Sequence, residues 1–229
     1  MTRALTMTLL ALLAGAPAVA QEHDHPPADA HAAGHHDLAT HEGMPDGWLM
    51  RFDREAAGPD MAAFEPMPPG WHVKTGRAGA GIVWMPEMAV AGPFTARSTF
   101  HLFNPASHAE SFGLFLGGSA LDAADQEYLY FLVRQTGEYL IKRRDGAETT
   151  NVVGWTRHDA IPVAPAGEPG PTRYDLAVEV GAGSVEFRVN GATVHTLPAA
   201  QVDADGVVGL RINHMLDIHV EELAVEGGR

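Results

Sequence analysis

The sequence predicts an all-β protein, built as a two-sheet antiparallel sandwich or jelly roll. From Gly47 onward, short runs of β-branched and aromatic residues recur, and Gly, Pro, Asn or Asp separate them about every 8–12 positions. Several of these runs alternate apolar and polar residues, which is the pattern of half-buried strands. Helical patterns extend for no more than a turn or two, and the best candidates lie near residues 121–125 and 199–203.

The clearest strands form a hairpin in the second half of the chain. Leu176, Val178 and Val180 are the apolar members of one alternating run, and a second run of the same kind covers residues 185–189. Asn190-Gly191 then predicts a type I′ turn, because both central positions of that turn need positive φ.

The other expected strands share this composition and are bounded by turn residues. Asp145-Gly146 predicts a further hairpin turn between two of them. The strands cover residues 70–74, 81–85, 94–103, 111–116, 127–134, 138–144, 151–155, 193–196, 207–212 and 216–225.

The first 46 residues have a different character. Residues 1–20 combine a positive charge at Arg3, an apolar stretch and small residues ending at Ala20, which is the pattern of a secretory signal peptide. We therefore expect cleavage near Ala20 and a periplasmic or secreted protein. Residues 21–46 are rich in His, Ala, Asp and Pro without apolar periodicity, so we expect a flexible arm before one domain at 47–229.

The composition argues against several classes of binding partner and binding site. The formal net charge of −14 argues against nucleic acid, whose binding proteins carry basic surfaces. The chain has no cysteine, which excludes disulfides and thiolate metal sites. The apolar stretch near the start is too short to span a bilayer comfortably, and none follows it, so we expect a soluble mature protein without a membrane span.

The arm is a candidate for binding transition metals. Neutral imidazole suits Cu²⁺, Ni²⁺ and Zn²⁺, and flexible ligands can wrap an ion without a preformed site. A plain linker is the alternative. The candidate ligands are His23, His25, His31, His35, His36 and His41.

A weaker metal candidate lies between two expected strands. Asp122 and Asp125, with nearby backbone carbonyls, offer the oxygen ligands that Ca²⁺ prefers. The alternative is a solvated loop.

Two strands place polar and aromatic side chains opposite their apolar faces. In residues 127–134, Tyr128, Tyr130 and Arg134 share one face, and Arg97 and His101 lie opposite the apolar face of 94–103. If the two strands share a sheet, these five residues line a carbohydrate groove in which tyrosines stack on sugar rings. The alternative is a half-exposed face of β-forming residues. Trp71, Trp84 and Trp155 are expected mainly in the core.

Lys142-Arg143-Arg144 is the basic cluster of this acidic chain. Because it adjoins the Asp145-Gly146 turn, it is either a solvated hairpin tip or a contact for an anionic ligand.

Several phrases resemble the concanavalin A-like (laminin-G-like) lectin/glucanase superfamily, and in particular secreted bacterial domains of the 3-keto-disaccharide hydrolase-like type. The resemblance spans about residues 47–226 and implies two curved antiparallel sheets. It leaves the activity open, because the superfamily includes lectins, glycosidases, lyases and adhesion modules. The phrases lie at 70–73, 79–84, 94–103, 112–115, 128–134, 173–180, 185–191 and 206–211.

The leading expectation is an exported module that binds a carbohydrate or a glycan-bearing surface and carries a metal-chelating arm. A carbohydrate hydrolase or lyase is one alternative. The glucanase pattern Glu-x-Asp-x-(x)-Glu is absent, so the sequence assigns no catalytic residue. An extracytoplasmic transition-metal-binding protein is the other alternative.

Overall fold

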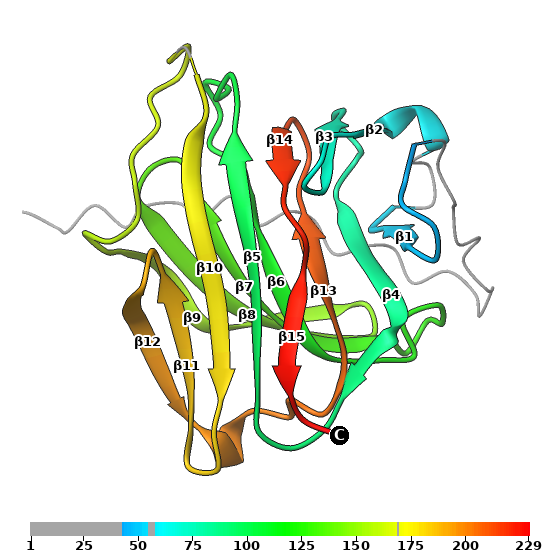
Figure 1. Cartoon of the computed structure of the whole chain (residues 1–229), viewed down its shortest axis with the longest axis vertical. Coiled ribbons are helices and arrows are strands. Elements are labelled where there is room, and N and C mark those ends of the chain that lie inside the picture. The colour runs from blue at the N-terminus through cyan, green and yellow to red at the C-terminus, as the bar shows by residue number, and fades with distance from the viewer. Residues whose placement is uncertain (1–42, 55–57, 169) are drawn as a thin grey trace, which may run out of the picture.

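The computed structural model describes residues 43–54, 58–168 and 170–229. Two antiparallel sheets face each other and enclose the core (Figure 1). In the part of the chain that is described, no helix is long and apolar enough to cross a membrane.

One layer is a seven-stranded sheet in the order β1-β4-β13-β6-β7-β8-β9. Each neighbouring pair is antiparallel. Its strands are β1 (Leu49–Phe52), β4 (Gly81–Val90), β6 (Ser111–Ser119), β7 (Glu127–Arg134), β8 (Glu138–Asp145), β9 (Glu148–Arg157) and β13 (Gly206–Ile212).

The other layer is an eight-stranded sheet in the order β12-β11-β10-β5-β14-β3-β2, with β15 paired to β5 beyond the end of β14. Its strands are β2 (Ala62–Pro66), β3 (Trp71–Thr75), β5 (Phe94–Leu102), β10 (Thr172–Val180), β11 (Ser184–Val189), β12 (Ala192–Pro198), β14 (Asp217–Val220) and β15 (Ala224–Gly227). Two 3₁₀ turns complete the fold, η1 (Pro59–Met61) and η2 (Ala199–Gln201).

The core lies between the sheets and is rich in aromatic rings. Phe131 of β7 meets Phe187 of β11 at 5.3 Å between ring centroids, and Phe100 of β5 meets Phe112 of β6 at 5.2 Å. Each of these contacts joins one sheet to the other, and all four rings are fully buried. Burial of this apolar area is the main force that holds the layers together.

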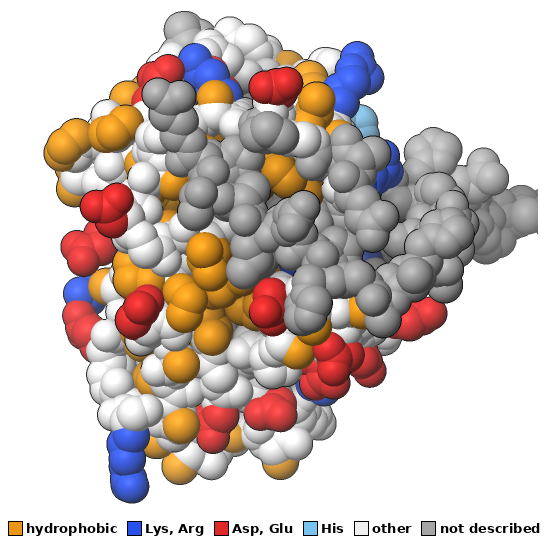
Figure 2. All heavy atoms as spheres, turned by 90° about the vertical axis from the view of Figure 1, so that its right-hand side faces the viewer, with side chains coloured by type: hydrophobic (Ala, Val, Ile, Leu, Met, Phe, Trp, Pro, Cys, Tyr) orange, Lys and Arg blue, Asp and Glu red, His pale blue; other side chains and the backbone are white. Residues whose placement is uncertain are grey.

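The edge of the sandwich beside β1 and β4 is only partly polar. Figure 2 shows hydrophobic side chains gathered near the middle of this edge, with acidic side chains around them. Met85 and Met88 of β4 are half-buried and pack against the core.

The structure confirms the all-β sandwich and each expected strand, with β7 matching its predicted bounds. The Asn190-Gly191 turn is also confirmed, because Asn190 and Gly191 have φ of 50° and 81°. The expected strand at 216–225 is two strands, β14 and β15, that share β5 as partner.

Strands β1 and β2 differ from expectation. They were not predicted, because runs of 4 and 5 residues are too short to show a clear period. The two segments with the best helical pattern extend no further than expected: residues 121–125 form a series of turns, and residues near 199–203 form a single 3₁₀ turn of 3 residues. Both segments are too short to offset the nucleation cost of an α-helix.

Candidate functional site

The two sheets have outer faces of very different character. The outer face of the eight-stranded sheet is polar, whereas that of the seven-stranded sheet carries a second apolar cluster. An antiparallel sheet usually presents a polar side to water, so an apolar outer face is a distinctive feature of this fold. The cluster comprises Ile82, Trp84, Phe115, Leu121, Tyr128, Tyr130, Leu132 and Leu140.

Strand β7 shows both the success and the limit of the alternation argument. As predicted, Phe131 lies in the main core and the two tyrosines lie on the opposite face. However, Tyr128 and Tyr130 are only 3% and 6% exposed. Their rings contact each other at 5.6 Å, and Tyr128 meets Phe115 at 5.2 Å. The expectation of free tyrosine rings is therefore wrong, because both rings are buried within the apolar cluster.

Burial of the tyrosines changes their acidity. Transfer of a phenolate from water into an apolar environment is unfavourable, so burial raises the pKa of Tyr128 and raises that of Tyr130 to about 12. The same cause raises the pKa of Tyr139 and Tyr174. These are all 4 tyrosines of the chain.

This uniform shift predicts the alkaline titration of the protein. We expect little phenolate absorption near pH 10 in the folded protein and normal titration in concentrated guanidinium chloride. Because the folded pKa values are raised, the stability that neutral tyrosines contribute is complete below pH 10, the usual pKa, and is lost as pH rises through the folded values. Ultraviolet absorbance of the tyrosinate band measures this titration, and equal folded and unfolded curves would contradict the burial.

Three arginines converge beside the tyrosines and share one carboxylate. Arg211 of β13 forms a two-pronged ion pair with Asp53, in which Nη1 lies 2.6 Å from Oδ1. Arg144 of β8 approaches the same carboxylate at 3.6 Å. Arg51 of β1 completes the set, since its charge acts on Asp53. We call Arg51, Arg144, Arg211 and Asp53 the arginine cluster.

The arginine cluster is held rigidly. Arg51 donates from Nη1 to the carbonyls of Leu121 and Ala123 at 2.8 and 2.6 Å, which ties the β6–β7 turn to β1. Burial alone would lower the pKa of Arg211, but the Asp53 carboxylate outweighs it and raises that pKa. Burial alone would raise the pKa of Asp53, but Arg211 outweighs it and lowers that pKa. Both groups therefore stay charged.

A more accessible strip lies along β7, β8 and β9 on the same outer face. Trp155 is half-buried against the apolar cluster, and the Arg134 guanidinium lies 4.1 Å from its ring centroid. Glu138 accepts from Arg134 Nε at 2.9 Å. Cross-strand pairing places Arg157 beside Glu138 and Asn151 beside Lys142. We call these residues the β9 strip, and they are Arg134, Glu138, Lys142, Asn151, Trp155 and Arg157.

The carboxylate of the β9 strip is ionised. Burial alone would raise the pKa of Glu138, but hydrogen bonds from Thr136 and Arg134 outweigh it and lower that pKa. The strip thus combines an aromatic ring, a carboxylate acceptor, an amide and several cationic donors within one half-exposed surface. Such a surface can stack on an apolar ring face and hydrogen-bond the polar groups at its rim.

The sequence did not place all five expected ligand-binding residues correctly. Strands β5 and β7 belong to different sheets, so Arg97 and His101 lie on the opposite outer face of the sandwich from Tyr128, Tyr130 and Arg134. The proposed five-residue groove is therefore wrong. Alternation fixes the face of each residue within its own strand but does not reveal which strands pair.

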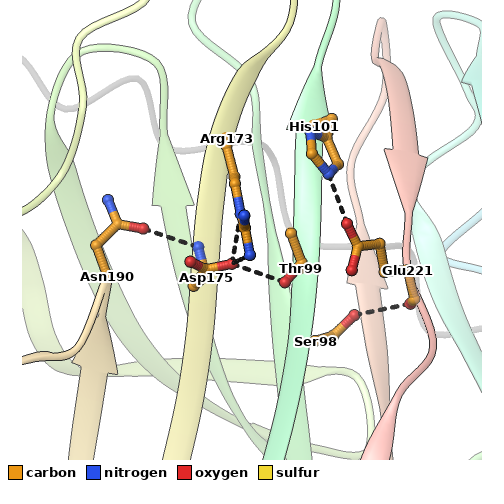
Figure 3. Close-up of polar contacts among 7 residues, drawn as sticks. All are labelled: Ser98, Thr99, His101, Arg173, Asp175, Asn190 and Glu221. Carbon is orange, nitrogen blue, oxygen red and sulfur yellow. Dashed lines mark hydrogen bonds and ion pairs between the residues drawn. The ribbon is translucent and has the colours of Figure 1, made fainter.

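The outer face of the eight-stranded sheet is instead a network of polar contacts. Figure 3 shows His101 pointing to Glu221, with His101 Nε2 2.8 Å from Oε1. Asp175 accepts from both Thr99 and Arg173, at 2.7 and 2.9 Å. Beyond this view, Arg97 forms an ion pair with Glu226. Several polar groups of this face thus pair with one another, whereas Nδ1 of His72 and Nδ1 of His219 are buried without a hydrogen-bond partner within the described ranges.

The structure offers no preformed metal site in the described part of the chain, where no group of three His, Cys, Asp or Glu side chains is arranged to hold an ion. Asp122 and Asp125 are exposed in the β6–β7 turn. The arm histidines His23, His25, His31, His35, His36 and His41 lie outside the described residues, as does the expected signal peptide.

Sequence reasoning missed most of the arginine cluster. Arg51 lies in a strand that was too short to predict, and Asp53 directly follows that strand. Arg211 lies in an expected strand, where its alternation with apolar neighbours was the available signal. Trp71 and Trp84 are buried as expected, Trp71 in the main core and Trp84 in the second apolar cluster, whereas Trp155 lies in the half-exposed strip.

Comparisons with known proteins show the fold. No model of a protein family and no curated protein matches the chain. A carbohydrate-binding module, CBM66 from Bacillus subtilis, is similar with a TM-score of 0.54 at 10% identity, over 82% of this chain and 99% of that one. A Bacillus subtilis protein of unknown function with a galectin-like fold has a TM-score of 0.53 at 13% identity, over 78% and 88%. These likenesses confirm that the chain has the two-sheet antiparallel sandwich of such modules.

Proposed function

We propose that the protein binds carbohydrate on the outer face of its seven-stranded sheet, at the β9 strip. The observation that carries this proposal is Trp155, a half-buried ring that lies beside an apolar cluster and among Arg134, Glu138 and Asn151. The similarity in fold to a carbohydrate-binding module supports it.

The chemistry of sugars fits this surface. A pyranose or furanose ring has an apolar C–H face, which stacks on an aromatic ring, and hydroxyl groups, which both donate and accept hydrogen bonds. Trp155 supplies the ring, the Glu138 carboxylate accepts, and Arg134 and Arg157 donate. Binding sites commonly combine apolar surface with a few oriented polar groups in this way.

The first test is the replacement of Trp155. We expect Trp155→Ala to weaken the binding of a polysaccharide, first identified on a glycan array, by about 30-fold or more, since a central aromatic contact typically contributes about 2 kcal/mol or more. Isothermal titration calorimetry measures the affinity, and thermal unfolding checks that the variant remains folded.

Matched controls lie on the opposite outer face. His101→Ala and Arg97→Ala remove two residues of the eight-stranded sheet that carry polar contacts of their own. We expect each to change the affinity by less than about twofold, because residues outside a contact surface leave binding near neutral. Loss of binding in these variants, with Trp155→Ala unaffected, would transfer the site to the other face.

A hydrolase or lyase of the keto-disaccharide type is the alternative for the same face. Retaining glycoside hydrolysis needs two carboxylates about 5–5.5 Å apart in separate acid and nucleophile roles. Asp53 and Glu138, two carboxylates that the structure describes on this face, are each paired with an arginine, which favours binding over catalysis. Release of reducing sugar from the bound polysaccharide would favour the enzyme.

Export and metal chelation by the arm remain part of the proposal, supported by the leader pattern and by six histidines within residues 21–46. Amino-terminal sequencing of the exported protein tests the first. Titration with Cu²⁺, Ni²⁺ and Zn²⁺ tests the second, and an unchanged protein spectrum and no bound metal would contradict it.

A further inference from the structure

The arginine cluster concentrates positive charge in an acidic protein. Three guanidinium groups, from Arg51, Arg144 and Arg211, surround the carboxylate of Asp53. The exposed Asp122 of the neighbouring turn also acts on Arg51. The chain as a whole has a formal net charge of −14, so this cluster differs in sign from its surroundings. An excess of positive charge in a largely buried cluster is unfavourable unless a group of opposite charge balances it.

Two N–H donors of the cluster lack acceptors. Nε of Arg144 and Nε of Arg211 are buried, and neither has a hydrogen-bond partner among the residues that the structure describes. Arg211 is only 7% exposed as a residue, and the Arg144 side chain is 12% exposed. A buried donor without an acceptor costs the free energy of its lost hydration. The cluster therefore has more donor capacity and positive charge than Asp53 satisfies.

Strand β8 connects the cluster to the β9 strip. Glu138, Leu140, Lys142 and Arg144 follow one another at every second position, and Lys142 and Arg144 lie opposite Tyr130 and Tyr128 of β7. A ligand that stacks on the β9 strip and extends along β8 therefore reaches Lys142 and then Arg144.

We propose that the carbohydrate ligand is an acidic glycan, whose carboxylate or sulfate is held at the arginine cluster by Arg144, the one arginine of the cluster that is not fully buried. This inference rests on the proposed function and adds the class of sugar. Anionic oxygen is the acceptor that guanidinium donors bind most strongly. The acidic remainder of the surface repels such a ligand, so the cluster also selects where it binds.

The test compares acidic and neutral polysaccharides on the full mature protein. We expect polygalacturonate, a carboxylate probe, or dextran sulfate, a sulfate probe, to bind at least about tenfold more tightly than neutral dextran or levan, as for one charge-assisted contact. Affinity for the acidic probe should fall as NaCl rises from about 0.02 to 0.5 M, because salt screens the attraction. Whichever acidic probe binds more tightly identifies the anionic group.

Arg144→Gln is the variant that locates the anion. We expect it to weaken binding of the acidic probe by roughly 10-fold or more and to leave neutral probes unchanged. Arg97→Gln is the matched control, since it removes the same charge from the other outer face, and we expect a change below about twofold. Thermal unfolding of both variants confirms that they are folded.

The outcomes separate the two proposals. Equal affinity for acidic and neutral probes would overturn the acidic ligand, and so would equal losses of affinity in Arg144→Gln and Arg97→Gln. The carbohydrate site itself would stand in either case if binding still depended on Trp155. Absence of binding to every polysaccharide would overturn the proposed function itself, and the class of ligand with it.

Discussion

Phe131→Ala should lower the free energy of unfolding by about 3–5 kcal/mol, the usual cost of truncating a buried phenylalanine. The Phe131 ring is fully buried and lies 5.3 Å from Phe187 of the facing sheet and 6.3 Å from Tyr139. Its removal leaves a cavity at a point where the two layers meet, and β7 and β11 cannot close it without moving whole sheets. Urea unfolding followed by tryptophan fluorescence measures the change.

Val152→Ala is the matched control. Val152 lies on β9 of the same sheet and is 39% exposed, so its truncation should change stability by less than about 0.5 kcal/mol. If Phe131→Ala were as mild as Val152→Ala, the two sheets would not pack through this ring, and the description of the core would be wrong.

Asp53→Ala should destabilise the protein by about 3 kcal/mol, because it leaves buried arginines without their shared counter-charge. Arg211 loses a two-pronged ion pair and Arg144 its nearest carboxylate. The Asp53 side chain is 25% exposed, which limits the loss to the lower end of the range for broken buried pairs. Asp125→Ala, the same charge change at an exposed turn residue, should be close to neutral.

The pH dependence of stability in Asp53→Ala tests whether Asp53 acts as a charged partner of Arg211. Because the folded pKa of Asp53 lies below its usual 3.8, the stabilisation is complete above that value and is lost as pH falls through the folded pKa. The wild-type protein should therefore lose more stability than the variant on acidification. Parallel acid curves would show that Asp53 and Arg211 do not interact as charges.

The strands could be predicted because their signals are local. Alternation along 127–134 and the Asn190-Gly191 turn each depend on a few neighbouring residues, and both match the structure. Pairing is not local: β5 joins β10 and β14 across long stretches of chain, and nothing within residues 94–103 excludes β7 as a neighbour. That is why Arg97 and His101 were grouped with the tyrosines of the other sheet.

The candidate site could be predicted only in part for a related reason. Alternation showed that Tyr128 and Tyr130 face away from the main core, but not that they would be buried there in a second apolar cluster with Phe115 and Leu121. Conversely, Trp155 was expected in the core on composition, whereas its place on β9, the last strand of the sheet, leaves it half-exposed. Arg134 is the expected ligand-binding residue that remains at the site with Trp155.

A crystal structure with a bound oligosaccharide, of the class found on the array, tests the central claim most directly. We predict a sugar ring stacked on Trp155, with hydroxyl groups bonded to Arg134 or Glu138, on the outer face of the seven-stranded sheet. A sugar bound instead beside His101 and Arg97, on the polar face of the eight-stranded sheet, would contradict the account.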